Sequence, residues 1–77
     1  MTVLVRPKQG IRDPQGEAIR RSLDELGYRC GEVRAGKLFD VELDAGGREQ
    51  ALELAGEIAA RVLANPLIEQ WELELES

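Results

Sequence analysis

The 77-residue sequence contains no histidine and a single cysteine, Cys30. Histidine is the commonest general base and a frequent metal ligand, and one cysteine provides neither a disulfide framework nor a Cys-x-x-Cys site. We therefore predict no catalytic residue, no metal site and no cofactor bound by this chain. Cys30 is interpreted as a small hydrophobic residue near the start of a strand.

Aromatic residues, positive charge and long apolar runs are scarce as well. Only 4% of the residues are aromatic, and 15 acidic against 10 basic residues give a net charge of −5. Nucleic-acid surfaces are basic and often carry stacking rings, so no nucleic-acid partner is expected. Neither a membrane span nor a signal peptide is recognisable, which predicts a cytoplasmic binding or assembly module without a membrane partner.

The residues that are present suffice for one small domain, which we place at residues 1–77. This length is below the roughly 100–150 residues of a typical domain, so a second domain is excluded. Hydrophobic residues make up 43% of the chain and recur at regular spacing, which argues against disorder. The predicted elements are a strand at Thr2–Arg6, a helix at Pro14–Leu26, hairpin strands at Glu32–Ala35 and Lys37–Asp44, a helix at Arg48–Ala64 and a strand at Ile68–Glu76.

The first helix has clear start and stop signals. Asp13 can accept hydrogen bonds from the free amides of the first turn, and Pro14 suits the first helical position. Gly27 favours the left-handed conformation that ends a helix. A single apolar stripe is predicted for this helix, formed by Ile19, Leu23 and Leu26.

The order strand, helix, strand, strand, helix, strand predicts an α+β fold, a ferredoxin-like βαββαβ sandwich with both helices on one face of an antiparallel sheet. The usual strand order, 4-1-3-2, would place the first strand between the third and the last. Acidic side chains then line the sheet face away from the helices, which we interpret as a solvated face rather than a catalytic one. These acids are Asp40, Glu42, Asp44, Glu72, Glu74 and Glu76, and the row Thr2, Leu4 and Arg6 lies between them.

Two short segments are candidates for binding. Arg34 and Lys37 flank Gly36 at the hairpin turn, where they could meet a phosphate or carboxylate of a partner or could simply be exposed turn charges. Gly16 stands inside the first helical turn, where glycine costs up to about 1 kcal/mol relative to alanine. Its presence there suggests the close approach of another backbone or side chain.

Three separated motifs together resemble the PurS family, the small subunit of phosphoribosylformylglycinamidine synthase. They are DPQG at Asp13–Gly16, VRAGK at Val33–Lys37 and LANPLIE at Leu63–Glu69, and the resemblance extends over essentially all 77 residues. Two positions depart from the family pattern: Arg12 replaces a frequent apolar residue, and Gln70–Trp71 replaces a more usual acid and tyrosine.

The resemblance implies a non-catalytic subunit of a purine-synthesis amidotransferase. In such a complex, a glutaminase subunit releases ammonia and a large synthetase subunit uses ATP and Mg²⁺ to activate the amide oxygen that ammonia displaces. Chains of this family form dimers, and the expected partners are these two subunits and a second copy or a higher homo-oligomer. We assign the partner contacts to residues that the expected fold does not fully explain: Arg12, Asp13, Gln15, Gly16, Arg34, Lys37, Asn65 and Glu69.

The order of elements alone also fits two other classes of protein. Regulatory domains of the ACT type share it and bind amino acids between paired copies, but their glycine-bearing loop after the first strand has only Gly10 as a counterpart here. Acylphosphatase-like enzymes share it too, although their arginine-bearing loop and catalytic asparagine are not matched convincingly. Binding of a small molecule by the isolated protein would distinguish the ACT alternative.

Overall fold

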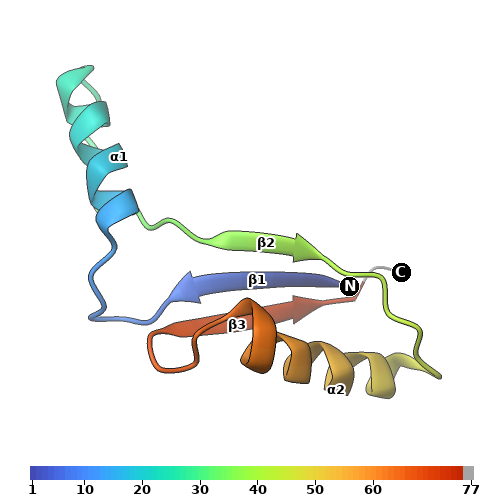
Figure 1. Ribbon diagram of the computed structural model, residues 1–77. Coiled ribbons are helices and arrows are strands. Elements are labelled where there is room, and N and C mark those ends of the chain that lie inside the picture. Colours follow the sequence, from blue (N-terminus) through green and yellow to red (C-terminus); the bar gives the residue numbers. More distant parts are fainter. Residues whose placement is uncertain (76–77) are drawn as a thin grey trace.

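The computed structural model describes residues 1–75 and has an α+β architecture (Figure 1). Three antiparallel strands form one sheet in the order β2-β1-β3, so the first strand is central, as predicted. The elements in chain order are β1 (Thr2–Pro7), α1 (Pro14–Glu25), β2 (Lys37–Asp40), α2 (Arg48–Ile58), the wider π-helical turn η1 (Ala59–Leu63) and β3 (Glu69–Glu74).

The core lies between β1 and α2. Val3 and Val5 are 0% and 1% exposed and form a buried cluster with Ala59 of η1, and Ala55 of α2 is equally buried. Small side chains allow a helix to approach a sheet closely, so water is excluded from this cluster. Trp71 points toward the same side, because it is paired with Val5 in the β1–β3 register and packs against this core.

The opposite sheet face is acidic and exposed, as the alternation predicts. Asp40 lies across from Thr2, whose hydroxyl donates to its carboxylate at 3.0 Å, and Glu72 lies across from Leu4. Arg6 is 4.0 Å from the carboxylate of Glu72, with both side chains more than half exposed. The other predicted acids Glu42, Asp44 and Glu74 are also exposed, and Glu76 lies outside the described residues.

Strand β2 is shorter than predicted. The expected strand reached Asp44, but β2 ends at Asp40, which is paired with Thr2. The amide of Val41 donates to the carbonyl of Met1 at 2.8 Å just after this last pair. Apolar and acidic residues continue to alternate beyond Asp40 without strand pairing, and the apolar ones, Val41 and Leu43, are half-buried.

The predicted strand at Glu32–Ala35 is wrong, since residues 32–35 have no regular secondary structure. A side chain takes the place of a strand partner there: the amide of Ala35 donates to the carboxylate of Asp13 at 2.7 Å. An amide used in this way cannot donate to a neighbouring strand. The sheet therefore has three described strands where the sequence predicted four.

Helix α1 has the predicted start and stop signals but a different place in the fold. Asp13 caps its first turn, Pro14 is its first residue, and Gly27 follows it with φ of 92°. The helix projects from one end of the sheet, whereas α2 lies along the sheet (Figure 1). The prediction of two helices on one face therefore holds for α2 alone.

The second helical segment confirms the predicted span but ends differently. Helix α2 continues directly into η1, whose last bond runs from the amide of Ala64 to the carbonyl of Ala59 at 2.8 Å. Pro66 follows within a turn and prevents further helix, as expected. Among residues 1–75, no helix has the length and apolar character needed to cross a bilayer.

Candidate subunit interface

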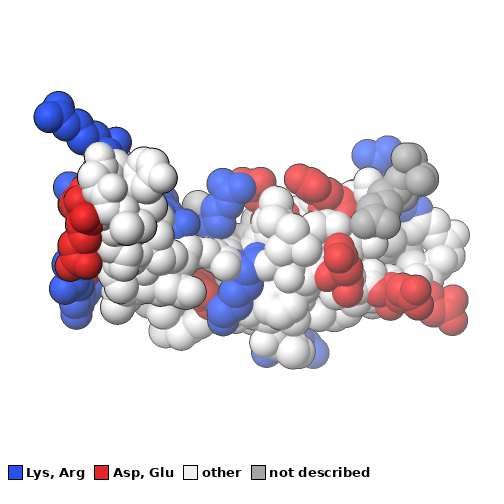
Figure 2. All heavy atoms as spheres, turned by 90° about the horizontal axis from the view of Figure 1, so that it is seen from above, with Lys and Arg blue, Asp and Glu red and all other residues white. Residues whose placement is uncertain are grey.

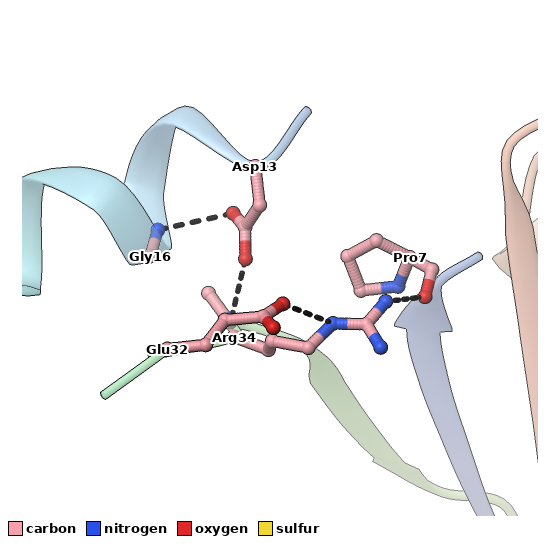
Figure 3. Close-up of polar contacts among 6 residues, drawn as sticks. Pro7, Asp13, Gly16, Glu32 and Arg34 are labelled. Atoms are coloured by element: carbon pink, nitrogen blue, oxygen red, sulfur yellow. Dashed lines mark hydrogen bonds and ion pairs between the residues drawn. The ribbon is translucent and has the colours of Figure 1, made fainter. Parts of the chain in front are cut away.

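The N-terminus of α1 is joined to the segment before β2 through the Asp13 carboxylate. One carboxylate oxygen accepts from the amide of Gly16 at 3.0 Å and the other from the amide of Ala35 at 2.7 Å (Figure 3). These bonds, the one from Ala35 first, hold the pKa of Asp13 below its ordinary value because they favour the charged carboxylate. We call these two bonds the Asp13 clasp.

Gly16 allows the same two segments to touch. It is buried, and a β-carbon at this position would overlap the backbone carbonyl oxygen of Val33. This contact confirms the close approach predicted from a glycine in the first helical turn. The contact and the Asp13 clasp together fix the direction in which α1 leaves the body.

Arg34 connects the same region to the end of β1. Its guanidinium donates to the backbone carbonyl of Pro7, and its Nε lies 3.6 Å from the carboxylate of Glu32 (Figure 3). Only 28% of the Arg34 side chain is exposed, and two of its polar atoms make these contacts within the chain. The interpretation of Arg34 as a simple exposed turn charge is therefore wrong.

Three other candidate residues present their side chains to solvent around this joint. Arg12 is 73% exposed and pairs with Glu17 at 3.4 Å, and Gln15 and Lys37 are exposed without a polar side-chain contact to the rest of residues 1–75. Gln15 and Lys37 share a hollow of about 350 Å³ with Asp13 and Glu69. The remaining lining residues of this hollow are Pro7, Pro14, Ala35 and Gly36.

Asn65 and Glu69 lie on either side of the turn at residues 66–68 that leads into β3. The Asn65 amide donates to the Glu69 carboxylate at 2.8 Å, and the Asn65 side-chain oxygen accepts from the amide of Leu67 at 3.1 Å. Glu69 lines the hollow described above, but Asn65 does not. The structure thus gathers seven of the eight candidate residues around one joint and connects Asn65 to it only through Glu69.

Sequence reasoning missed the backbone groups that complete the joint. The carbonyls of Pro7 and Val33 and the amide of Ala35 carry no side-chain signal. An available hint was the combination of Asp13 with Gly16, because a capping carboxylate has a second oxygen that can bind an amide from elsewhere. This arrangement surrounds a fixed backbone framework with exposed polar side chains.

Charge is unevenly divided between the projecting segment and the rest of the molecule. Residues 8–37 contain seven basic and five acidic side chains, whereas residues 1–7 and 38–75 together contain three basic and nine acidic ones. Figure 2 shows basic side chains around α1 and several acidic ones over the half of the molecule away from it. Within residues 1–75, no three histidine, cysteine, aspartate or glutamate side chains come together as metal ligands would.

Known proteins resemble this chain over nearly its whole length. The sequence model of one family, PurS: phosphoribosylformylglycinamidine (FGAM) synthase, matches residues 1–77. The phosphoribosylformylglycinamidine synthase subunit PurS of Mycobacterium leprae is 41% identical over 68 residues, covering 87% of this chain and 82% of that protein.

Two solved structures have the same fold. PurS of Methanocaldococcus jannaschii, one of the subunits of formylglycinamide ribonucleotide amidotransferase in the purine biosynthetic pathway, matches with a TM-score of 0.86 and 33% identity over 97% of this chain and 92% of its own. A chain in the structure of PurLQS from Thermotoga maritima matches with a TM-score of 0.82 and 33% identity, covering 92% and 89% of the two chains.

Proposed function

The chain belongs to the PurS family of phosphoribosylformylglycinamidine synthase subunits, which act in purine biosynthesis, and we propose that it joins the synthetase and glutaminase subunits of that enzyme without supplying a catalytic group. The single observation that carries this proposal is the joint between α1 and the sheet. Exposed polar side chains surround a fixed backbone framework there, an arrangement suited to protein contact.

Arg12, Gln15 and Lys37 are the contact residues in this proposal, because their side chains are exposed and add little to the joint itself. Asp13, Gly16 and Arg34 then act indirectly, since their internal bonds hold the surrounding backbone in place. This division separates residues that touch the partner from residues that position the contact surface.

The chemical step in this proposal belongs to the partner subunits. The glutaminase would release ammonia, and the synthetase would use ATP and Mg²⁺ to activate the amide of the ribonucleotide substrate. The present chain would act as a dimer that holds the two together. A small domain whose fully buried apolar residues are few gains stability from association. Family membership leaves the ACT-like, amino-acid-binding alternative without support.

Reconstitution of the three-subunit enzyme tests the proposal. We expect glutamine-dependent amidine formation and co-elution of the subunits only when this protein is added to purified synthetase and glutaminase. The double variant Arg12→Glu/Lys37→Glu should lower the apparent affinity of assembly at least about tenfold, because charge reversal at an interface replaces attraction with repulsion. It should leave the fold unchanged, because neither side chain is part of the core.

The matched control is Arg48→Glu, a charge reversal at the start of α2, at the end of the molecule away from α1 (Figure 1). This variant should assemble like the unchanged protein. Full glutamine-dependent activity without the protein would overturn the proposal. If the control weakens assembly as much as the double variant does, the contact does not lie at this joint.

A further inference from the structure

The sheet face turned away from α2 carries a hollow at the end nearest α1 (Figure 1). The hollow has a volume of about 400 Å³ and is lined by residues 4–6 of β1 and by residues 34–38 beside them. Leu4 and Leu38 are paired in the β1–β2 register, so their side chains point to this face together. Sites for small organic molecules have volumes of roughly 300–1,000 Å³ and mostly apolar walls, so this hollow has a suitable size and floor.

Two guanidinium groups line this hollow, those of Arg6 on β1 and Arg34 in the segment before β2. Among the described residues that line it, none is acidic. Lys37 belongs to the lining as well, but it is paired with Val5, so its side chain points to the other face of the sheet. The other charged residues that the strand registers place on the hollow's face are acids, namely Asp40, Glu72 and Glu74. The hollow is therefore a positively charged site on an otherwise acidic face.

Both guanidinium groups have N–H donors left for a ligand. Arg34 directs its Nε toward Glu32 at 3.6 Å, and one terminal nitrogen donates to the carbonyl of Pro7. Its other terminal nitrogen has no polar contact within residues 1–75, and Figure 3 shows this nitrogen turned away from both partners. Arg6 makes no hydrogen bond within residues 1–75, where its polar neighbour is the Glu72 carboxylate at 4.0 Å.

The two carboxylates beside these guanidinium groups are held only weakly. The side chain of Glu72 is 61% exposed and that of Glu32 is 75% exposed. Ion pairs this exposed contribute little to stability because water screens them, so both carboxylates can turn into solvent when another anion takes their place. Arg34 would stay in position, since the carbonyl of Pro7 still holds it.

We propose that this hollow binds a small phosphate ester, with Arg6 and Arg34 on the phosphate group and with Leu4 and Leu38 against the organic part. The inference goes beyond the proposed function, because joining two subunits requires no small molecule. A phosphate monoester carries a charge of about −1.5 to −2 at neutral pH and three free oxygens, which match two guanidinium groups. A carboxylate would neutralise only one of them.

Calorimetric titration of the purified protein provides the first test, with adenosine 5′-monophosphate as the probe. We expect saturable binding of this nucleotide at low salt and none of adenosine, which lacks the phosphate. Adenosine 5′-carboxylic acid carries one negative charge in the same place and should bind at least about tenfold more weakly. Absence of nucleotide binding, or equal affinity for either of the other two compounds, would overturn the proposal.

Inorganic phosphate tests the part played by the two leucines. It can meet both arginines but has no organic part to lie on Leu4 and Leu38. It should therefore bind at least about tenfold more weakly than the nucleotide. An affinity equal to that of the nucleotide would overturn the assignment of the hollow to an ester.

The variant Arg6→Gln identifies the contribution of one arginine, and Arg21→Gln is its matched control. Both remove one positive charge, but Arg21 lies on the polar side of α1 and does not line the hollow. Arg6→Gln should weaken nucleotide binding at least about tenfold, because charge-assisted hydrogen bonds to the phosphate are lost. It should still fold, since the Arg6 side chain is 57% exposed. Equal weakening by both variants would mean attraction to overall charge alone and would overturn the site.

Amide resonances of the unchanged protein locate the bound nucleotide without a variant. Titration should shift the amides of residues 4–6 and 34–38 and leave those around Gly56 in α2 in place. If the largest shifts fall instead in the first turn of α1, the phosphate lies at that helix end. Such a result would contradict the assignment to Arg6 and Arg34.

Discussion

The two helices of this chain are held in place by different forces. Helix α1 is fixed by polar contacts at its base, where the Asp13 carboxylate binds two amides, and its apolar stripe is largely exposed. Helix α2 follows Gly47 without a side-chain cap, and the helical segment that it forms with η1 is fixed by packing: Ala55 is buried, and Ala59 packs against Val3 and Val5 of the sheet. One helix is well capped and poorly packed, and the other is the reverse.

Capping and packing therefore determine different properties of a helix. Capping signals are local, so they determine where a helix begins and ends. The place of a helix in the fold depends on contacts distant in sequence, and for α1 a clasp of hydrogen bonds settles it. The effects of substitutions on stability should therefore differ between the two helices in size, in sign and in pH dependence.

The largest effect is expected in the packed region. Val5→Ala removes two methyl groups from a side chain that is 1% exposed, and it should lower the free energy of unfolding by about 2–3 kcal/mol. Arg21→Ala, on the solvated side of α1, should change the free energy of unfolding by no more than about 0.5 kcal/mol. Urea denaturation at one fixed protein concentration measures both, and equal losses would contradict the contrast.

The next effect is a difference in sign: the change from glycine to alanine should lower stability in one helix and raise it in the other. Gly16→Ala should destabilise the protein by about 1–3 kcal/mol, because the new β-carbon meets the rigid carbonyl of Val33. Gly56→Ala in α2 has no atom within 4 Å of the new carbon and should stabilise by up to about 1 kcal/mol. A thermal denaturation series that finds both changes stabilising would mean that α1 is free to move away from Val33.

The smallest effect is a pH dependence confined to the α1 joint. The pKa of Asp13 is lowered in the folded protein, so its charged carboxylate stabilises the fold. This stabilisation is fully present above the ordinary aspartate pKa and is lost as pH falls through the lower pKa of the folded protein. The amide resonances of Gly16 and Ala35 should follow this titration, because both amides donate to the Asp13 carboxylate.

The variant Asp13→Asn provides the control for that titration. It keeps a side-chain oxygen that can accept a hydrogen bond but has no charge to lose, so the acid-induced shifts at Gly16 and Ala35 should disappear. A titration midpoint above the ordinary aspartate value in the unchanged protein would contradict the clasp as described.

The same contrast explains what could be predicted from the sequence. The start of α1 at Asp13–Pro14 and the alternation along β1 and β3 are local patterns, and they are confirmed. The extent of β2 depended on its pairing with β1, which ends at Thr2 and Asp40, and alternation within the segment carries no signal of that pairing. The false strand at Glu32–Ala35 arose because the bond from Ala35 to the Asp13 carboxylate has no local signature.

The candidate contact residues show the same limit. Gly16 was identified because a glycine in a helical turn is locally unfavourable, and its contact with Val33 explains it. Arg34 was assigned to the partner contacts, with an exposed turn charge as the alternative, but its guanidinium is bound to the carbonyl of Pro7 and lies near the Glu32 carboxylate. Sequence patterns found the right neighbourhood, while the division between internal and exposed side chains required the structure.

Amide hydrogen exchange would show most sharply whether the polar contacts at its base hold α1 in place. In the variant Asp13→Ala, which removes both carboxylate oxygens, the amides of Gly16, Ala35 and the first turn of α1 should lose protection, while those of α2 near Ala55 keep theirs. Protection of α1 that is equal in the variant and the unchanged protein, or an equal loss in both helices, would mean that the Asp13 clasp does not hold α1.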